Sequence, residues 1–304
     1  MARRAGVAVR PRWIGVALFA AGVVAGTIAD RPVPREPIVL GGYRVLSGDF
    51  HAHSSMWSNG MLTPWGLVLQ ARRAGLDVLA VTGHNEVWDA KVARAFARSF
   101  GGPTVIVGQE IHSVTHHVVA AGIQHAVDFR RPLEDQLDDI HRQGGIAIAA
   151  HPVKNFHAGF SDAAVERLDG TELCGPVIYF DRKAAGELET FAARGTMTPI
   201  GSSDFHGWAR LGDCRTYLFA SDDGESAVID AIRAHRTVVY SPKGKVFGDP
   251  DLVALAATRP ELRSRATEPP GSGPLEWVSR VLGIGGFAWW VLAQRVSVGD
   301  RRTR

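Results

Sequence analysis

Histidines and acidic residues recur where the short apolar runs of this sequence end. They lie in Asp49-Phe50-His51-Ala52-His53, Gly83-His84, Gln109-Glu110, Ala150-His151 and Ser203-Asp204-Phe205-His206, and a further run begins near His116-His117. If these apolar runs are strands of a barrel, the loops at their carboxyl ends converge on one face, where active sites form. Residues far apart in the sequence would then meet, and their imidazole and carboxylate groups suit zinc, manganese or iron.

The middle of the chain alternates between strand-like and helix-like segments. This alternation favours a parallel sheet with helical crossovers, either open or closed into a barrel. We expect strands at Tyr43–Phe50, Asp77–Thr82, Thr104–Gly108, His117–Ile123, Ile146–Ala150, Gly170–Leu173, Thr198–Gly201, Thr216–Ala220 and Thr237–Tyr240. We expect helices at Pro64–Ala74, Ala90–Ser99, Leu133–Gln143, Ser161–Leu168, Ala184–Arg194 and Gly224–Ala234.

The positive charge of the chain is concentrated at its two ends. Residues 1–12 carry +4, from Arg3, Arg4, Arg10 and Arg12, and residues 295–304 carry +3. Because the whole chain carries only +3, the residues between these ends carry −4. A slightly acidic body argues against nucleic-acid binding, which needs a basic face on the folded domain.

Residues 13–29, from Trp13 to Ala29, form an apolar stretch without a single charge. A helix of this length covers about 25 Å, just short of a typical hydrocarbon core. The arginines before it would stay in the cytoplasm, so the rest of the chain would be exported. We favour a membrane anchor over a cleaved signal segment, for which Thr27-Ile28-Ala29 would be a tolerable cleavage site.

A second apolar stretch, Trp277–Gln294, is also followed by arginines. Its tryptophans suit a membrane interface, whereas Arg280 is costly there unless it reaches the membrane surface. The stretch would span the membrane, lie in the interface or pack on the barrel, and all three alternatives stay open. Cys174 and Cys214 could pair outside the cytoplasm, but sequence does not show whether they lie within bridging distance, so we treat both as buried apolar residues and leave their pairing open.

The histidine and acid motifs, taken in order, resemble those of the PHP (polymerase and histidinol phosphatase) family. The matching segments are His51-Ala-His53, Thr82-Gly-His84-Asn85, Gln109-Glu110, His117-Val-Val-Ala-Ala-Gly122, Ala150-His151-Pro152 and Ser203-Asp204-Phe-His206. The resemblance implies an α/β fold, a distorted seven-stranded (β/α)7 TIM-like barrel. It also implies two or three divalent metal ions, Zn, Mn or Fe, at the mouth of this barrel.

The resemblance assigns metal ligands position by position. A first ion would be held by His51, His53, Glu110 and Asp204. A second would share Glu110, with His117 and His151 as its other ligands. A third would be held by Asn59, His84 and His206.

The sequence departs from the family pattern at the third metal site. The amide of Asn59 is a poorer ligand than the acid or histidine usual in the family. Gly83 stands where the family usually has an acid, the kind of residue that orients a metal-bound histidine. We therefore prefer a two-metal centre.

The family resemblance implies a metal-dependent hydrolase, with a phosphoesterase as the leading interpretation. A hydroxide bridging the metals would attack the ester, and His84 or His206, if not ligands, would protonate the leaving group. Lys154, Arg210 and Arg215 are candidate anchors for a small phosphorylated substrate, although a solvated surface charge is the plainer interpretation of each.

Two other functions stay open. The same centre would hydrolyse carboxyl or carbamate esters, or a membrane-tethered barrel without catalysis would act as a scaffold. We expect a membrane-anchored protein with its catalytic domain outside the cytoplasm, or a secreted one if the signal is cleaved. The expected segments are a basic cytoplasmic tail (1–12), the anchor or signal (13–29), a linker (30–42), the PHP domain (43–243), a second linker (244–273), an apolar helix (274–294) and a basic tail (295–304).

Overall fold

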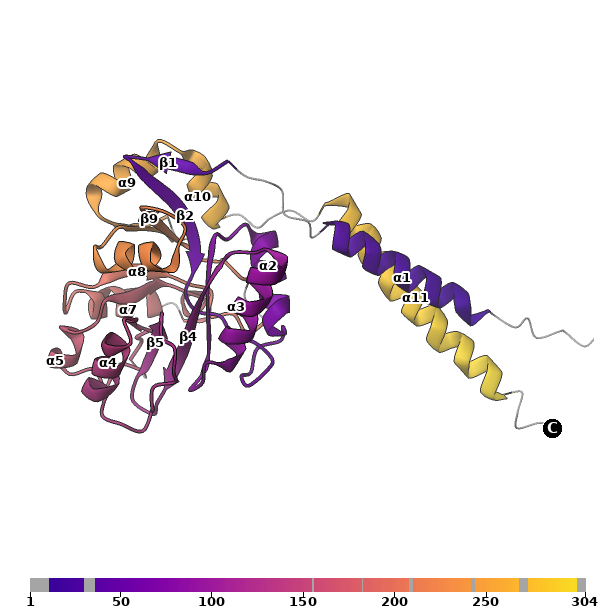
Figure 1. The fold of residues 1–304 in the computed structure, drawn as a ribbon, viewed down its shortest axis with the longest axis horizontal. Helices are drawn as coiled ribbons and strands as arrows, with labels where there is room; N and C mark the ends of the chain where they lie inside the picture. The colour runs from indigo at the N-terminus through magenta and orange to yellow at the C-terminus, as the bar shows by residue number, and fades with distance from the viewer. Residues whose placement is uncertain are drawn as a thin grey trace, which may run out of the picture. The chain divides into compact units, whose positions relative to one another are not determined.

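The computed structural model describes residues 11–29, 36–154, 156–181, 183–207, 210–241, 244–267 and 273–299. The tail residues 1–10 and 300–304 and residues 30–35 of the expected first linker lie outside the described residues. The chain divides into two compact units (Figure 1). The smaller unit contains residues 1–33 and 270–304, and the larger contains residues 34–269.

The larger unit is built on one mixed sheet. Ten strands form a continuous path in the order β11-β10-β9-β2-β3-β4-β5-β6-β7-β8, and β1 pairs with β2 beside it. Strands run parallel from β2 to β4 and from β6 to β8, whereas β5, β9 and β10 are antiparallel to their neighbours. The strands are β1 (Ile38–Leu40), β2 (Tyr43–Asp49), β3 (Val78–His84), β4 (Thr104–His112), β5 (His117–Ala121), β6 (Ile146–Ala149), β7 (Gly170–Cys174), β8 (Thr198–Gly201), β9 (Thr216–Ala220), β10 (Thr237–Tyr240) and β11 (Val246–Gly248).

The α/β class and the barrel-like form are confirmed, but the expected number of seven strands is wrong. Short turns add antiparallel strands that an alternation of strands and helices does not reveal. One such turn, Gly41-Gly42, joins β1 to β2 with positive φ at both glycines, a conformation that glycine adopts readily.

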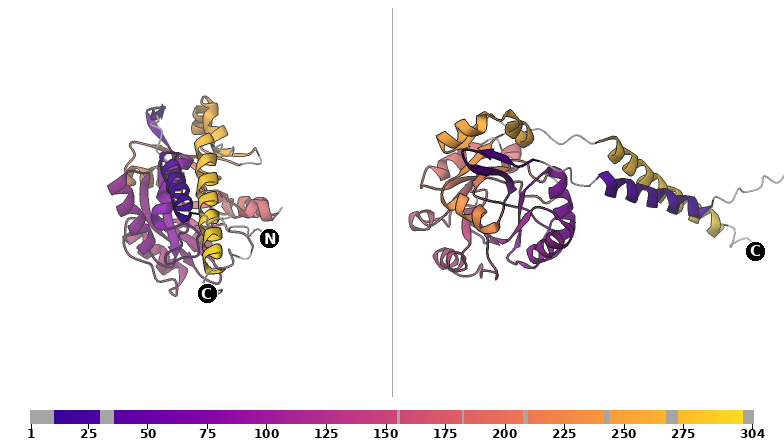
Figure 2. Two further views of the ribbon diagram at one scale, coloured as in Figure 1. Left: turned by 90° about the vertical axis from the view of Figure 1, so that its right-hand side faces the viewer. Right: turned by 45° about the horizontal axis from the view of Figure 1, so that its top comes forward.

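The sheet nearly closes on itself, because β8 at one end of the path lies against β9 and β10. The hydroxyl of Thr237 donates to the carbonyl of Pro199 over 2.8 Å, and that of Thr216 accepts from the amide of Gly201 over 2.9 Å. Helices surround the sheet, most of them around its outside (Figure 2). They are α2 (Pro64–Ala74), α3 (Trp88–Phe100), α4 (Leu133–Arg142), α5 (Asp162–Val165), α6 (Val177–Phe180), α7 (Ala184–Ala192), α8 (Glu225–Arg233), α9 (Pro250–Ala257) and α10 (Pro260–Thr267).

Helix α2 illustrates how the sequence sets an element's bounds. The hydroxyl of Thr63 accepts from the amide of Gly66 and caps the first turn, in which Pro64 needs no hydrogen-bond partner for its nitrogen. Gly75 ends the helix in the left-handed conformation, with φ +68°. Leu67 and Ala71 belong to its buried stripe, which packs against the sheet.

Alternate residues of the strands face two hydrophobic cores. Val78 and Ala80 of β3 pack with residues of the other strands and with α8, whereas Leu79 and Val81 pack with the outer helices. Helix α8 lies across the amino ends of β6 and β8, where the carbonyl of Ile232 accepts from Thr198 over 2.6 Å. That end of the barrel is therefore covered, and the carboxyl ends of the strands carry the candidate site.

Residues 244–273, expected to form a linker, contain β11, α9 and α10 instead. The hydroxyl of Tyr217 donates to the carbonyl of Leu262 over 2.6 Å, and Leu252 and Ala266 join a core with strands β9 and β10. The proline and glycine content suggested a linker, but Pro250 and Pro260 occupy the first turns of the two short helices, where proline is tolerated.

Cys174 and Cys214 are buried as expected, and they form a disulfide, the alternative that we did not favour from the sequence. Cys174 ends β7 and Cys214 precedes β9, and the barrel brings their Cα atoms within 5.4 Å. Their separation of 40 residues in sequence carried no sign of this contact. Both side chains lie in a buried cluster with Val239 and Ile178.

The smaller unit consists of two long helices that pack against each other, α1 (Arg12–Ala29) and α11 (Pro274–Gly299). Helix α1 is long and apolar enough to cross a membrane, judged by length and composition alone.

Candidate metal centre

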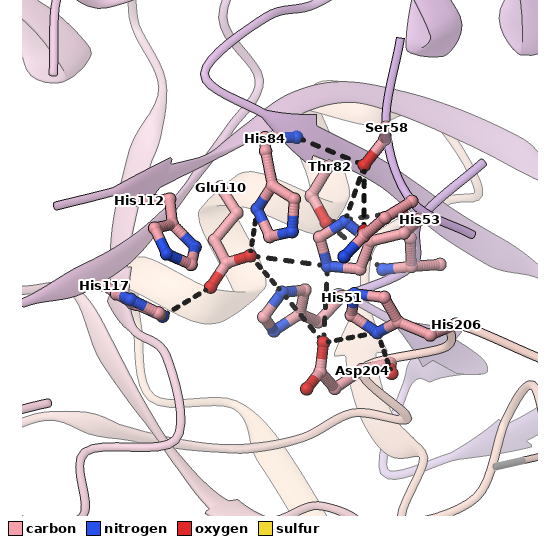
Figure 3. Close-up of polar contacts among 12 residues, drawn as sticks. His51, His53, Ser58, Thr82, His84, Glu110, His112, His117, Asp204 and His206 are labelled. Atoms are coloured by element: carbon pink, nitrogen blue, oxygen red, sulfur yellow. Dashed lines mark hydrogen bonds and ion pairs between the residues drawn. The ribbon is translucent and has the colours of Figure 1, made fainter. Parts of the chain in front are cut away.

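The carboxyl ends of the strands collect the histidines and acids that the motifs predicted (Figure 3). Strand β5 runs antiparallel to β4, so its first residue lies at the same end of the barrel. The contributing residues are His51 and His53 after β2, His84 at the end of β3, Glu110 in β4, His117 at the start of β5, His151 after β6, and Asp204 and His206 after β8.

Four side-chain atoms converge in the arrangement expected around a single ion. The Nε2 atom of His51 lies 3.4 Å from Glu110 Oε2 and 3.4 Å from Asp204 Oδ1. The Nε2 atom of His53 lies 3.4 Å and 3.3 Å from the same two oxygens. Tetrahedral ligands at about 2.0–2.1 Å from a metal would be about 3.3–3.4 Å from one another. These four nitrogen–oxygen distances therefore match ligands that share one metal ion.

The second oxygen of Glu110 faces another pair of histidines. Its Oε1 atom lies 2.9 Å from His117 Nδ1 and 3.3 Å from His151 Nε2. A nitrogen of His151 also lies with a nitrogen of His51 and a carboxylate oxygen of Glu110 in a group that could hold a metal. The two carboxylate oxygens of Glu110 therefore face different sets of histidines.

The third group of candidates lies at the more exposed edge of the cluster. His53, His84 and His206 bring one nitrogen each within 4.8 Å of the others, and His84 Nδ1 is 2.9 Å from Glu110 Oε2. The Nδ1 atom of His206 is directed at the backbone carbonyl of Asp204 over 2.9 Å, which leaves its other ring nitrogen for a ligand or proton.

The polar atoms at the centre of this cluster are buried without hydrogen-bond partners, although they lie close together. They are His51 Nε2, His53 Nε2, His84 Nδ1, His117 Nδ1, Glu110 Oε1 and Asp204 Oδ1. Buried polar atoms are rarely left unsatisfied, and here they are directed at shared points rather than along one another's hydrogen-bond axes. Nitrogen and oxygen donors in this arrangement fit divalent zinc, manganese or iron.

Two neighbouring side chains fix the orientation of the central histidines. Glu172 Oε1 lies 2.9 Å from His51 Nδ1, and Ser58 Oγ lies 3.2 Å from His53 Nδ1. Each contact occupies the outer ring nitrogen and turns the inner nitrogen toward the cluster, as orienting partners do around metal-bound histidines. Glu172 also accepts from the backbone amide of His151 over 2.7 Å.

Asp49 ties together the loops that carry the site. Its carboxylate accepts from the backbone amides of Ser203 over 3.0 Å and Gly212 over 2.7 Å, which lie after β8 and before β9. Complete burial raises the pKa of Asp49 despite these hydrogen bonds. The backbone of the candidate ligands His151 and Asp204 is strained, with φ of +29° and +43°. Such strain in non-glycine residues is concentrated at functional sites.

The charges of the cluster favour ionised acids. Burial alone would raise the pKa of both Glu110 and Asp204, but the charge of His51 contributes to holding each well below its usual range. Burial lowers the pKa of His53 to about 4, so this imidazole is neutral near pH 7. Burial opposes protonation of His51 too, yet the surrounding acids raise its pKa, so a cation binding there would displace a proton.

Four candidate residues are not brought into the cluster: Asn59, Lys154, Arg210 and Arg215. Asn59 is exposed, and its neighbour Ser58 makes the contacts with His53 and with the backbone of His84. Lys154 is exposed, and half-exposed Arg210 pairs with Asp213 over 3.4 Å.

Arg215 is the clearest correction among the expected substrate anchors. It is only 4% exposed and donates to the carbonyls of Gly212 over 3.1 Å and Ala74 over 3.2 Å. Its guanidinium therefore holds the barrel together rather than facing a substrate.

Position 83 is a glycine where the family usually has an acid, but two other acidic side chains occupy the space beside it. A Cβ atom at Gly83 would lie 2.5 Å from Glu86 Oε1 and 2.8 Å from Asp89 Oδ2. Asp89 is fully buried and accepts from Ser54 Oγ over 3.0 Å, next to His53. Burial, and the neighbouring carboxyl of Glu86, raise the pKa of Asp89 to about 8.

Two residues of the site were missed from the sequence. His112 lies with its ring centre 4.7 Å from that of His84 and 4.0 Å from that of His117, and its nitrogen belongs to a group with His84 and Glu110. Its position two residues after Glu110 was the available signal. Glu172 lies inside an expected strand. The only sequence signal for its role was that a charged residue stands in a buried strand, where charged residues are rare.

Comparison with known proteins supports the fold. No family model matches this chain. Over 139 residues it is 24% identical to an uncharacterized protein of Methanocaldococcus jannaschii, covering 42% of this chain and 81% of that protein. A two-domain protein from Bacteroides vulgatus contains a predicted PHP-like metal-dependent phosphoesterase, and its crystal structure aligns with a TM-score of 0.60 and 21% identity over 75% of this chain and 74% of that one. The chain has a PHP-like fold. The structure of an amidohydrolase from Chromobacterium violaceum aligns with a TM-score of 0.40 and 19% identity. This alignment covers 52% of the protein described here and 87% of the amidohydrolase.

Proposed function

We propose that this PHP-like protein is a metal-dependent hydrolase and that its substrates are phosphate esters. The observation that carries the proposal is the set of four atoms from His51, His53, Glu110 and Asp204, whose nitrogen–oxygen distances match ligands that share one ion. The two oxygens of Glu110 face different histidines, which supports a second ion beside the first.

Bound divalent ions would supply a water of lowered pKa as the nucleophile and would polarise the ester. The protein contributes ligands held in place by the buried acids Glu172 and Asp49, so little reorganisation is needed when a substrate binds. His84 and His206, at the more exposed edge of the cluster, are positioned to hold the proton that the leaving group takes.

An open pocket beside the cluster suggests where the organic part of the ester binds. It has a volume of about 350 Å³ and is lined by His112, Ser113, Val114, Phe129 and Arg130. His112 belongs to both the pocket and the metal-ligand group. We infer that a substrate whose ester lies on the metals places an apolar group, such as an aryl ring, against Val114 and Phe129.

The metal and the reaction are tested together on the full-length protein in detergent. We expect bound zinc, manganese or iron by elemental analysis, and hydrolysis of an aryl phosphate in preference to the matching aryl carboxylic ester. Glu110→Gln should remove both bound metal and activity, whereas Glu189→Gln, a surface acid paired with Lys245, should leave both unchanged. Purified protein that takes up no metal would contradict the hydrolase and favour a scaffold.

The pocket is tested by comparing naphthyl phosphate with methyl phosphate. Phe129→Ala should raise KM for naphthyl phosphate and not for methyl phosphate. Phe100→Ala, at an exposed position on α3, is the matched control and should change neither. An equal change for both substrates would argue against the pocket while leaving the hydrolase intact.

One observation keeps a second substrate class in view. Arg215 is enclosed by the barrel and Arg210 is paired with Asp213, so two of the three expected phosphate anchors are already engaged. A carboxyl or carbamate ester would not need such anchors. Preferential hydrolysis of the aryl ester or carbamate over the aryl phosphate would assign the centre to that class.

We further propose that the hydrolase works outside the cytoplasm on a small molecule and does not bind nucleic acid. Disulfides persist in oxidising compartments, and Cys174 and Cys214 are paired. Helix α1 supports export, as either an anchor or a cleaved signal.

A further inference from the structure

Helices α1 and α11 pack against each other through glycines along much of their length. A Cβ atom at Gly15 would lie 2.7 Å from the carbonyl oxygen of Gly286, and one at Gly22 would lie 2.6 Å from the nitrogen of Gly283. A Cβ atom at Gly26 would lie 2.7 Å from the side-chain oxygen of Ser279. Because later residues of α1 meet earlier residues of α11, the helices are antiparallel. The close backbone approach is of the kind that small residues permit between membrane helices.

Two polar contacts join the same two helices. Ser279 Oγ donates to the carbonyl of Gly22 over 2.8 Å, and the indole nitrogen of Trp289 donates to the carbonyl of Pro11 over 3.1 Å. The contact between α1 and α11 therefore extends from the start of α1 to near its end. Cleavage after Ala29 would remove the surface on which α11 packs.

The outward surfaces of this helix pair are apolar and uncovered. Trp13 is 69% exposed, Val24 58% and Ile284 72%, and Phe19, Val281 and Phe287 are exposed as well. Two helices alone cannot bury apolar side chains on all sides, so this surface needs another apolar environment. At about 1.5 Å per residue, 18 and 26 residues give helices of about 27 Å and 39 Å, comparable to a bilayer core of about 30 Å.

The charges of the chain are arranged as a bilayer requires. Arg12 begins α1 and Arg295 lies near the end of α11, so the antiparallel pairing places these two positions at the same end of the pair. In the sequence, further arginines precede Arg12 and follow Arg295. At the other end, Arg280 is paired with Glu276 and lies over the ring of Trp277, 5.2 Å from its centre. Arginine clusters stay on the cytoplasmic side of a membrane, and an arginine near a helix end can reach the interface.

We propose that α1 and α11 form a two-helix membrane hairpin, and that α1 is retained rather than cleaved. Both arginine clusters lie in the cytoplasm, and the occupant of the outward apolar surface is the lipid bilayer. Residues 36–267, which contain the whole PHP-like barrel, are inserted between the two spans on the opposite side. The disulfide between Cys174 and Cys214, in an oxidising compartment, agrees with this topology.

Cysteine cross-linking in native membranes tests the pairing of the helices. A Cβ atom at Gly26 would lie 3.7 Å from that of Ser279, close to the separation of about 3.8 Å found in disulfides. Gly26→Cys combined with Ser279→Cys should form a cross-link between α1 and α11 under mild oxidation. Val24→Cys combined with Ser279→Cys is the control and should not, because Val24 faces outward. Equal cross-linking of both pairs, or of neither, would overturn the hairpin.

Retention and topology are tested on the same full-length chain. Its intact mass from membranes should include residues 13–29, and a membrane-impermeant maleimide should label Ser99→Cys, an exposed site on the barrel, in intact spheroplasts. The same reagent should label Ala5→Cys and Thr303→Cys only after permeabilisation. A mature chain beginning after Ala29, or labelling of either terminal cysteine in intact spheroplasts, would refute the proposal. These readouts do not depend on catalysis.

Discussion

Glu172 holds His51 through a contact of 2.9 Å between Oε1 and Nδ1, on the side of the imidazole that faces away from the metal cluster. Both residues are buried, so no water can replace this contact. The carboxylate of Glu172 also accepts hydrogen bonds from the backbone amide of His151 and the hydroxyl of Ser202. A single carboxylate thus orients candidate ligands of both proposed ions.

Glu172→Gln should therefore weaken metal binding. Replacing an outer partner of a metal-bound histidine typically lowers metal affinity about 10–100-fold. Competition with a chromogenic chelator would measure this loss in the full-length protein. Glu189→Gln should bind metal as the wild type does, and an equal affinity for Glu172→Gln would show that this contact does not orient His51.

The buried carboxyl of Asp89, beside Gly83, should make stability fall as pH rises. Asp89 has an ordinary pKa of 3.8 and a folded-state pKa of about 8, so between these values the folded protein keeps a proton that the unfolded chain has released. Its contribution is greatest below about pH 4 and is lost as pH rises toward 8, with a slope of at most about 1.4 kcal/mol per pH unit. Denaturant unfolding from pH 5 to 9 would show this trend, and Asp89→Asn should flatten it. Asp230→Asn, on the exposed face of α8, should keep the trend unchanged.

Substitution of two nearby arginines should separate a structural role from a surface one. Arg215→Met leaves buried carbonyls of Gly212 and Ala74 without a donor and should cost about 1–3 kcal/mol of unfolding free energy. Arg210→Met removes only a half-exposed ion pair with Asp213 and should cost less than about 0.5 kcal/mol. Similar costs for the two variants would contradict the enclosed position of Arg215.

Loss of the disulfide should destabilise the barrel. Cys174 and Cys214 are separated by 40 residues in sequence, and such a cross-link typically contributes about 2–4 kcal/mol. The double variant Cys174→Ala with Cys214→Ala should show this loss in denaturant unfolding without reductant. Adding reductant should destabilise the wild type and leave the double variant unchanged.

Much of the fold was predictable because its central elements carry local signals. The nine expected strands are present as β2 to β10, and α2 is bounded by a capping threonine and a terminating glycine. What local patterns did not show were the short antiparallel additions β1 and β11 and the helices α9 and α10. These depend on turns and on packing with distant strands, as when Tyr217 binds the carbonyl of Leu262.

The candidate site was predictable where a motif marked a strand end and not elsewhere. His51, Glu110 and Asp204 stand in motifs whose chemistry is evident from residue type alone. Glu172 and the cysteine pair depend on which strands become neighbours, and that follows from the three-dimensional path of the sheet. Arg215 was misjudged because charge suggests exposure, whereas Arg215 instead donates to buried backbone carbonyls.

The antiparallel pairing of α1 and α11 has a consequence for how the barrel could leave the cell surface. If both helices are anchors, the barrel is tethered at its beginning and its end. One proteolytic nick, in either connecting segment, would leave it attached through the other helix. Shedding into the medium would require two separate cleavages, so a population of soluble barrel would report the action of a protease on both tethers.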